Sequence, residues 1–348
     1  MKVPVKETVS DKFVHIHTLV GYRRLQMNVT VLGTGRWGTF HAVYHSRRND
    51  VVLWGLEGSP DFEQLKKERK NSYLELPANL ILEDDLGKAL DHAQYVIISI
   101  SSQHLREFAE RINGYDVSGK TFILCMKGIE IATGDRLSTI IKDTIKQDIK
   151  ICVWVGPGHV QDFMAGIPNC MVIDSEDKRV IDDVVSKFSG NLIRLYKGND
   201  IIGTEVGAAA KNVIGIAAGM LDGLHVSSLK GALMARGARE VSRLIKAMGG
   251  NELSAYGLSH LGDYEATLFS LHSQNRMFGE KFINGEKYEK LAEGVSTARA
   301  MMNLSERYNV ELPISKMIYD ILYNDFDPKY ALSRLFSRDI KEEFSNDY

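Results

Sequence analysis

Short apolar runs alternate with amphipathic stretches from Met27 to about Leu195, and no other feature restricts the possible fold as strongly. The predicted strands read VTVL, VVLW, YVIISI, TFILCM, ICVWVG, CMVI and LIRLY. They are rich in valine, isoleucine and aromatic residues, and several are separated by segments with helical periodicity. Strands that alternate with helices predict a parallel sheet covered by helices.

After about Asn199 the alternation ends and the long segments have helical periodicity. These segments are EVGAAAKNVIGIAAGMLDGL, KGALMARGAREVSRLIKAMG, STARAMMNLSERY and PISKMIYDILYN. A chain of 348 residues is long for a single core and suits two domains. The sequence therefore predicts an α/β, Rossmann-like parallel-sheet domain at residues 27–198 and an all-helical domain at residues 199–348.

The composition is that of an ordinary globular protein, with 44% hydrophobic and 25% charged residues. The net charge of -2 provides no positive field for nucleic acid or anionic lipid, so we expect neither as a partner. Cys125, Cys152 and Cys170 form no C-x-x-C pair and have no histidines at metal spacing. They predict reduced cysteines, no metal site and a cytoplasmic location.

Residues 1–26 form a mixed, polar N-terminal extension without the apolar region of about 7–15 residues that a signal peptide needs. Two interpretations stay open: an extension that belongs to the protein, or an upstream start that the cell does not use. The longest apolar stretches, such as Val213–Leu221, fall short of the ~20 residues of a membrane span, and we expect none.

A glycine loop follows the first predicted strand in VTVLGTGRWGTF, where Gly33, Gly35 and Gly38 have G-x-G-x-x-G spacing. The first glycine permits a tight turn, the second lets the backbone approach a pyrophosphate, and the third lets helix and strand pack closely. The following helix directs free N–H groups at the phosphates. This context predicts a dinucleotide site; a glycine-rich turn without a ligand is the alternative.

Two charged residues bear on the choice of cofactor. Glu57 lies 19 residues after Gly38, where a carboxylate binds the ribose hydroxyls and repels a 2′-phosphate, which favours NAD. A solvated surface charge explains Glu57 as well. Arg36, inside the glycine loop, can contact a phosphate and keeps NADP possible.

Further polar residues follow predicted strands, at the ends where parallel sheets bind ligands. Lys127 comes after TFILCM, and the Gly-Pro-Gly turn of WVGPGHV comes after the next strand. Ser102 follows YVIISI and is equally well explained as a helix N-cap. Asp263 lies in the turn of HLGDYEAT, with Thr267 four residues on.

Lys211 is the single charged residue of VGAAAKNVIGIAAG. Apolar surroundings move the pKa of a lysine toward neutrality, which suits acid/base catalysis. A nicotinamide enzyme that reduces a ketone must deliver a proton to the oxygen, and the chain has no obvious catalytic histidine. Lys211 is therefore the candidate acid, with Asp263 to orient it; an ammonium that simply extends to water is the alternative.

The chain resembles the NAD(P)-dependent sn-glycerol-3-phosphate dehydrogenases of the soluble bacterial type from about Met27 to the end. The matching segments, in family order, are VLGTGRWGT, SSQHLRE, MKGIE, VGPGHVQDFMAGIP, EVGAAAKNVIGIAAGMLDGL, LGDYEAT, SQNRMFG and LAEGVSTARA. The resemblance implies a Rossmann-like domain, a helical domain, a site between them and a homodimer.

The resemblance also implies roles for individual residues. Lys211 would be the general acid/base, with Lys127 and Asp263 beside it as catalytic residues. The substrate site would comprise Lys127, Gly156, Lys211, Asp263, Thr267, Ser273, Gln274, Asn275 and Arg276. Together with the residues named above, the cofactor contacts would be Gly33, Gly35, Arg36, Trp37, Gly38, Glu57, Lys127, Val160, Leu291 and Glu293.

Three departures from the family pattern concern substrate recognition. Gln274 stands where the family usually has an arginine that helps to hold the substrate phosphate. Gly158 replaces a hydroxyl residue, and Arg36 replaces a serine of the glycine loop. A charged hydrogen bond is worth roughly 1.5–3 kcal/mol, so Gln274 predicts weaker phosphate binding unless another cation, such as Arg276, takes over.

Three functions follow in order of preference. The first is interconversion of dihydroxyacetone phosphate and sn-glycerol 3-phosphate with NAD, or with NADP. The second, motivated by Gln274 and Gly158, is the same chemistry on a different small oxo or hydroxy compound. The third is a nucleotide-binding protein without catalysis, which the presence of Lys127, Lys211 and Asp263 disfavours.

Overall fold

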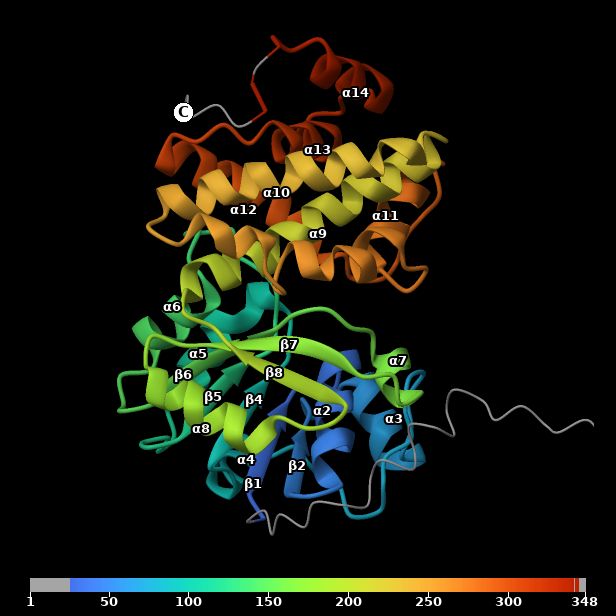
Figure 1. The fold of residues 1–348 in the computed structure, drawn as a ribbon. Coiled ribbons are helices and arrows are strands. Elements are labelled where there is room, and N and C mark those ends of the chain that lie inside the picture. Colours follow the sequence, from blue (N-terminus) through green and yellow to red (C-terminus); the bar gives the residue numbers. More distant parts are fainter. Residues whose placement is uncertain (1–25, 341, 344–348) are drawn as a thin grey trace, which may run out of the picture.

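The computed structural model describes residues 26–340 and 342–343, so the predicted extension lies outside the described residues except for Gln26. An eight-stranded sheet forms the first half of the chain, and helices form the second (Figure 1). The strands are β1 Asn28–Leu32, β2 Asp50–Trp54, β3 Ile81–Glu83, β4 Tyr95–Ile98, β5 Thr121–Leu124, β6 Lys150–Val155, β7 Asn169–Asp174 and β8 Ile193–Lys197. All seven predicted strands are present, and β3 was not predicted.

The strand order is β3-β2-β1-β4-β5-β6-β7-β8, and the order reverses direction beside β1. Chain segments after β1 and β4 therefore diverge to opposite sides, which leaves room for a ligand at the carboxyl ends of these strands. Every pair is parallel except β6 and β7, which are antiparallel. The expectation of a parallel sheet thus needs this correction: the link from β6 contains only the short helix α7 (Val160–Met164), and β7 runs back beside β6.

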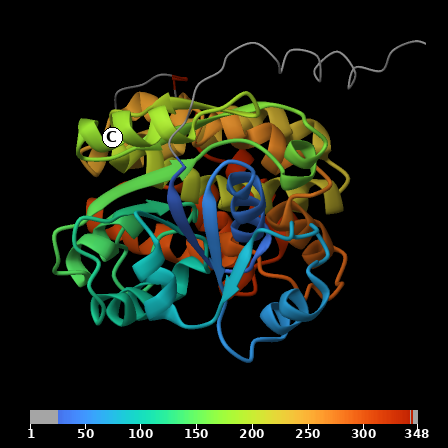
Figure 2. The same cartoon turned by 90° about the horizontal axis from the view of Figure 1, so that it is seen from below.

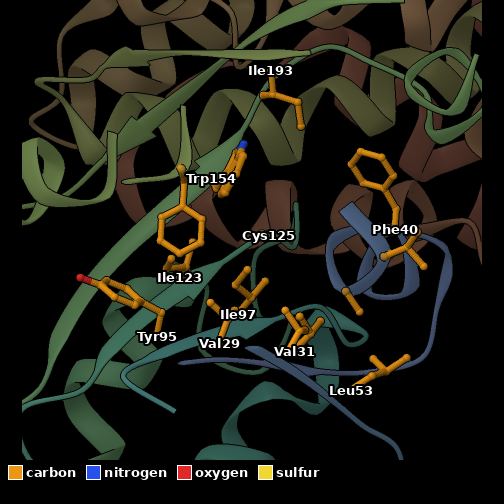
Figure 3. Close-up of a cluster of buried hydrophobic side chains, with 14 of the residues drawn as sticks. Val29, Val31, Phe40, Leu53, Tyr95, Ile97, Ile123, Cys125, Trp154 and Ile193 are labelled. Carbon is orange, nitrogen blue, oxygen red and sulfur yellow. The ribbon is translucent and has the colours of Figure 1, made fainter. Parts of the chain in front are cut away.

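Side chains alternate between the two faces of the sheet, because successive residues of a strand point in opposite directions. Ile97 and Ile123 belong to the core under one face, whereas Ile98 and Leu124 belong to the core under the other. Figure 3 shows the first of these cores, with Trp154 among the side chains. Both faces are buried, so the strands are continuous apolar runs, as parallel sheets require.

Helices cover both faces of the sheet. They are α2 Arg36–Ser46, α3 Pro60–Glu68, α4 Leu86–His92, α5 Leu105–Asn113, α6 Leu137–Thr144 and α8 Lys178–Phe188, together with α7. The second half holds α9 Ile201–Gly223, α10 Lys230–Ala247, α11 Gln274–Ile283, α12 Glu293–Tyr308, α13 Pro313–Tyr323 and α14 Pro328–Phe336. Seen from below, the sheet half lies in front of this helical half (Figure 2).

Helix α9 runs through the middle of the helical half and contacts α10, α11, α12 and α13 (Figure 1). Its residues from Val206 to Leu221 are all buried, since the helix is apolar on every side. Contrary to the length estimate from sequence, α9 is long and apolar enough to cross a membrane, but 89% of its apolar window is buried inside the protein. It is the core helix of the second half.

Candidate active site

The glycine loop after β1 fits a dinucleotide. Gly33 has φ +117°, and a Cβ there would lie 2.3 Å from the carbonyl oxygen of Ser99 on the neighbouring chain segment. A Cβ at Gly38 would lie 2.0 Å from the Gly33 oxygen, whereas one at Gly35 would meet nothing within 4 Å. The outer two glycines are therefore required by packing, and the middle one leaves open space where a pyrophosphate can approach the start of α2.

The other proposed cofactor residues lie around this loop in different ways. Trp37 is half-buried, and the Lys127 ammonium lies 5.9 Å from its ring centroid. Glu57 is exposed, just beyond the carboxyl end of β2, and Leu291 is 63% exposed. Val160 is 1% exposed and packs in the sheet core, so a cofactor can reach only its backbone.

Glu293 begins α12 and accepts a hydrogen bond from the Ser102 backbone N–H at 3.3 Å. Desolvation raises the pKa of Glu293 to about 7, against the opposing effect of that hydrogen bond. Ser102 is buried and starts a short 3₁₀ helix whose N-cap is Ser101. Ser102 is thus a partner of Glu293 rather than the predicted N-cap.

Two lysines from different halves of the chain share one carboxylate. The Asp263 Oδ2 atom accepts hydrogen bonds from the Lys127 ammonium at 2.7 Å and from the Lys211 ammonium at 2.8 Å. Lys127 also donates to the Gly156 carbonyl at 2.8 Å. Lys211 also donates to the Thr267 hydroxyl at 2.7 Å, which in turn donates to the Asp263 carbonyl at 2.6 Å. Five predicted site residues are therefore brought together.

Burial lowers the pKa of Lys211 to about 8, although Asp263 opposes the shift. The side chain is only 8% exposed, so the ammonium does not extend into bulk water, and that alternative is wrong. An ammonium has three donors. Two of them are bound by Asp263 and Thr267, which leaves the third for a substrate oxygen.

Asn275 joins α11 to this cluster through amide hydrogen bonds. Its Nδ2 donates to the Asn212 oxygen at 3.0 Å, and its oxygen accepts from the Gly294 N–H at 2.9 Å. The Asn212 amide donates to the Lys127 carbonyl at 3.1 Å. A chain of contacts thus runs from Lys127 through α9 to α11 and the start of α12. The sequence analysis missed Asn212, although its place directly after Lys211 on α9 was a usable signal.

Three residues predicted to bind the substrate have structural partners. Ser273 caps α11 by accepting from the Arg276 N–H at 3.3 Å. Gln274 donates to the His272 carbonyl at 3.3 Å and accepts from the Tyr288 hydroxyl at 2.5 Å. The Arg276 guanidinium is buried against Asp222 and Glu280.

The Arg276 guanidinium is therefore already paired with carboxylates, which disfavours the prediction that it takes over from the missing phosphate-binding arginine. The reason is its helical position, because the side chain points from α11 toward Asp222. Asp222 lies 11 residues after Lys211 on α9, which is about three helical turns away.

His159, which the sequence analysis did not select, lies beside the site. Its Nε2 atom is buried without a hydrogen-bond partner, and its ring lies 5.7 Å from that of His272. Burial lowers its pKa, and the charges of Asp263 and Lys211 act on it. A possible signal was its position after the Gly-Pro-Gly turn. Within the described residues, no group of three or more His, Cys, Asp or Glu side chains can hold a metal ion.

Comparisons with known proteins place this arrangement in a family. Residues 28–181 match the model of the NAD-dependent glycerol-3-phosphate dehydrogenase N-terminus, and residues 200–333 match that of its C-terminus. A glycerol-3-phosphate dehydrogenase [NAD(P)+] of Prosthecochloris aestuarii is 35% identical over 91% of this chain and 100% of its own length. This chain belongs to the NAD-dependent glycerol-3-phosphate dehydrogenase family. The relative of Thermoanaerobacter sp. is 34% identical over 91% of this chain and 99% of its own.

A solved structure of this dehydrogenase family has the same fold. The crystal structure of glycerol-3-phosphate dehydrogenase from Coxiella burnetii superimposes with a TM-score of 0.84 at 26% identity. The alignment covers 90% of this chain and 99% of that one. The mostly parallel sheet followed by helices is therefore the fold of the glycerol-3-phosphate dehydrogenase family, as the sequence predicted.

Proposed function

We propose that this protein interconverts dihydroxyacetone phosphate and sn-glycerol 3-phosphate, with Lys211 as the general acid/base. The observation that carries the proposal is the buried Lys211 ammonium, which Asp263 and Thr267 hold with one donor left over. Family membership supports the substrate, since the similar proteins carry the name glycerol-3-phosphate dehydrogenase [NAD(P)+].

The cofactor is NAD, with NADP as the second possibility. The open space at Gly35 and the close packing at Gly33 and Gly38 fit a pyrophosphate, and Trp37 and Glu293 are proposed as further cofactor contacts. When bound, the nicotinamide supplies the hydride, and the protein supplies the proton and the geometry. Glu57, exposed after β2, favours the ribose hydroxyls of NAD over a 2′-phosphate.

Proton transfer follows from the state of Lys211. In reduction its ammonium donates a proton to the carbonyl oxygen; in oxidation the neutral amine accepts the hydroxyl proton. A pKa of about 8 makes both forms accessible near neutral pH. Lys127 and Asn275 hold the substrate, and Asp263 keeps the two ammonium groups in place.

A steady-state assay tests the proposal with dihydroxyacetone phosphate and NADH, then with NADPH, and with glycerol 3-phosphate and NAD in reverse. Turnover of the phosphorylated ketone is expected, with NADH preferred. No turnover with either cofactor contradicts the proposed function. Family membership disfavours the alternative of an unrelated oxo compound, and the same assay with unphosphorylated ketones separates the two.

A homodimer in the cytoplasm is part of the proposal and rests on the resemblance to the soluble bacterial enzymes. Sedimentation equilibrium measures the first point directly. A mass of about twice 39.0 kDa is expected, and a mass of one chain at assay concentration contradicts it.

A further inference from the structure

The start of α11 carries a neutral side chain where the resemblance places a phosphate-binding arginine. The Gln274 amide is bound on both sides, by the His272 carbonyl at 3.3 Å and by the Tyr288 hydroxyl at 2.5 Å. Neither bond brings a positive charge to this place. A substrate phosphate that approaches α11 therefore needs its cation from elsewhere.

Arg36 reaches the same place from the sheet half of the molecule. Its Nη1 atom donates to the His272 carbonyl at 3.4 Å, the same oxygen that accepts from Gln274. Its guanidinium also lies over the Tyr73 ring, 4.9 Å from the centroid. Arg36 and His272 are 236 residues apart, so this contact spans the two halves.

The two lysines of the site and the two cations at the far end of α9 already have carboxylate partners. Lys127 and Lys211 share Asp263. Lys230 and Arg276 share Asp222 at the far end of α9. Arg36, in contrast, pairs with no carboxylate in the described part of the chain; its contacts are the His272 carbonyl and the Tyr73 ring. A guanidinium has five N–H donors, and most of those of Arg36 are left for an anion.

Two histidines lie between Arg36 and the pair of lysines that share Asp263. His272, whose carbonyl binds Arg36, places its ring 5.7 Å from the ring of His159. The charges of Asp263 and Lys211 act on the pKa of His159, the first raising it and the second lowering it. The contacts of Arg36 and those of Lys211 are therefore linked through these two rings.

We propose that Arg36 binds the phosphate of the substrate, in place of the arginine that is absent at position 274. The inference rests on the proposed function, and it changes the role that the glycine loop suggested for Arg36, which was contact with the cofactor. The cation proposed for the phosphate thus lies in the sheet half of this chain, whereas the family arginine would lie in the helical half. Gln274 and Arg36 both donate to the His272 carbonyl.

The test compares Arg36→Ser, Arg36→Lys and the double variant Arg36→Ser/Gln274→Arg in the full-length protein. Arg36→Ser is expected to raise the KM for dihydroxyacetone phosphate about ten- to a hundredfold, the effect of one charged hydrogen bond or two. Arg36→Lys keeps the charge but loses the planar pair of guanidinium donors, so it is expected to raise this KM less. The double variant, which returns an arginine to position 274, restores most of the affinity.

Two controls isolate the phosphate. Unphosphorylated dihydroxyacetone is expected to give the same kcat/KM in the wild type and in Arg36→Ser, and the KM for NADH stays unchanged. Arg194→Ser is the matched variant, since Arg194 also lies over a tyrosine ring, 5.2 Å from that of Tyr196, but far along the sheet on β8. It is expected to behave like the wild type.

An unchanged KM for dihydroxyacetone phosphate in Arg36→Ser overturns the inference, as does a rise confined to NADH, which assigns Arg36 to the cofactor. An equal loss with unphosphorylated dihydroxyacetone also overturns it. These results differ from failure of the proposed function, in which the wild type itself does not turn over the phosphorylated ketone.

Discussion

At the scale of single residues, the site depends on one carboxylate between two ammonium groups. Asp263 accepts from Lys127 and Lys211 through the same oxygen and is itself 1% exposed. A buried carboxylate that loses its charge would leave two like charges side by side, which is strongly unfavourable. The acid strength of Lys211 therefore depends on Asp263 as well as on burial.

The pH dependence of catalysis is expected to follow Lys211. Reduction needs its protonated form, so kcat/KM for dihydroxyacetone phosphate should be level at low pH and fall as the pH rises through about 8. Oxidation of glycerol 3-phosphate needs the neutral form and should rise over the same range. Measuring kcat/KM for reduction and for oxidation from pH 6 to 10 tests this prediction. Two rates that both fall, or both rise, with pH would contradict it.

In Asp263→Asn, the fall of kcat/KM for reduction is expected to occur at lower pH than in the wild type. The carboxylate raises the pKa of Lys211 against the larger effect of burial, so its removal lets that pKa fall further. Asp222→Asn is the matched control, because Asp222 also bridges two cations, Lys230 and Arg276, away from the site. It should lower stability and leave the pH profile in place. Equal profiles for Asp263→Asn and the wild type would rule out this coupling.

At the scale of elements, the close approach of α9 and α11 positions Asn275 against Asn212, the residue after Lys211. A Cβ at Gly219 of α9 would lie 1.9 Å from the Arg276 oxygen, and one at Gly279 of α11 would lie 2.2 Å from the Ile216 oxygen. Backbone meets backbone at both points, so a side chain would force the helices apart. The small residues of this apolar helix are therefore part of the site's geometry.

Gly219→Ala is expected to lower the free energy of unfolding by about 1–3 kcal/mol, as overpacking does. It should also raise the KM for the substrate, because α11 carries Asn275. Gly231→Ala in α10 is the matched control, since a Cβ there meets nothing within 4 Å. It should be neutral or stabilise by up to about 1 kcal/mol. Denaturant unfolding measures both variants, and equal losses would show that helix contact is not the cause.

Sequence patterns predicted the elements well where local periodicity decides them. The runs around Val31, Ile97 and Ile123 became buried strands because short continuous apolar runs rich in β-branched residues favour strands that are buried on both faces. The antiparallel β7 and the short β3 were not predictable, since pairing direction depends on chain connections that local patterns do not contain.

The site was predictable in part. Lys211 could be selected because a charge among apolar residues is conspicuous, Lys127 because it follows a predicted strand, and Asp263 as a carboxylate that could orient Lys211; the resemblance supported all three. The partners of Arg36 and Arg276 could not be predicted, because each depends on a residue far away in the sequence, namely His272 and Asp222. Whether an arginine has a carboxylate partner thus depends on contacts between residues distant in sequence, which residue type alone does not reveal.

At the scale of the whole molecule, buried polar contacts join the two halves. Glu205 near the start of α9 accepts from the Ser138 N–H at 2.9 Å and its hydroxyl at 2.6 Å, and from Arg136 at 2.6 Å. Burial raises the pKa of Glu205, against the effect of Arg136. This junction keeps α9, and with it Lys211, in a fixed position against the sheet that carries Lys127.

Glu205→Gln is expected to lower the free energy of unfolding by about 1–3 kcal/mol, because it leaves the Arg136 charge unpaired and weakens three hydrogen bonds. The pH profile of catalysis should not move, since Glu205 does not contact the lysine cluster. Glu63→Gln, at an exposed position of α3, serves as the control and should stay within about 0.5 kcal/mol of the wild type. Thermal and denaturant unfolding measure these values; equal stability of both variants would contradict the role of the junction.

The most direct test of the account is the kcat of Lys211→Met for dihydroxyacetone phosphate reduction, measured beside NADH affinity. Lys230→Met is the control, because Lys230 is a second buried lysine in the described part of the helical half and is paired with Asp222. Loss of a general acid predicts a fall in kcat of about 10²–10⁴ for Lys211→Met, with NADH affinity retained and no comparable fall for Lys230→Met. A Lys211→Met variant that turns over at the wild-type rate would contradict the central claim.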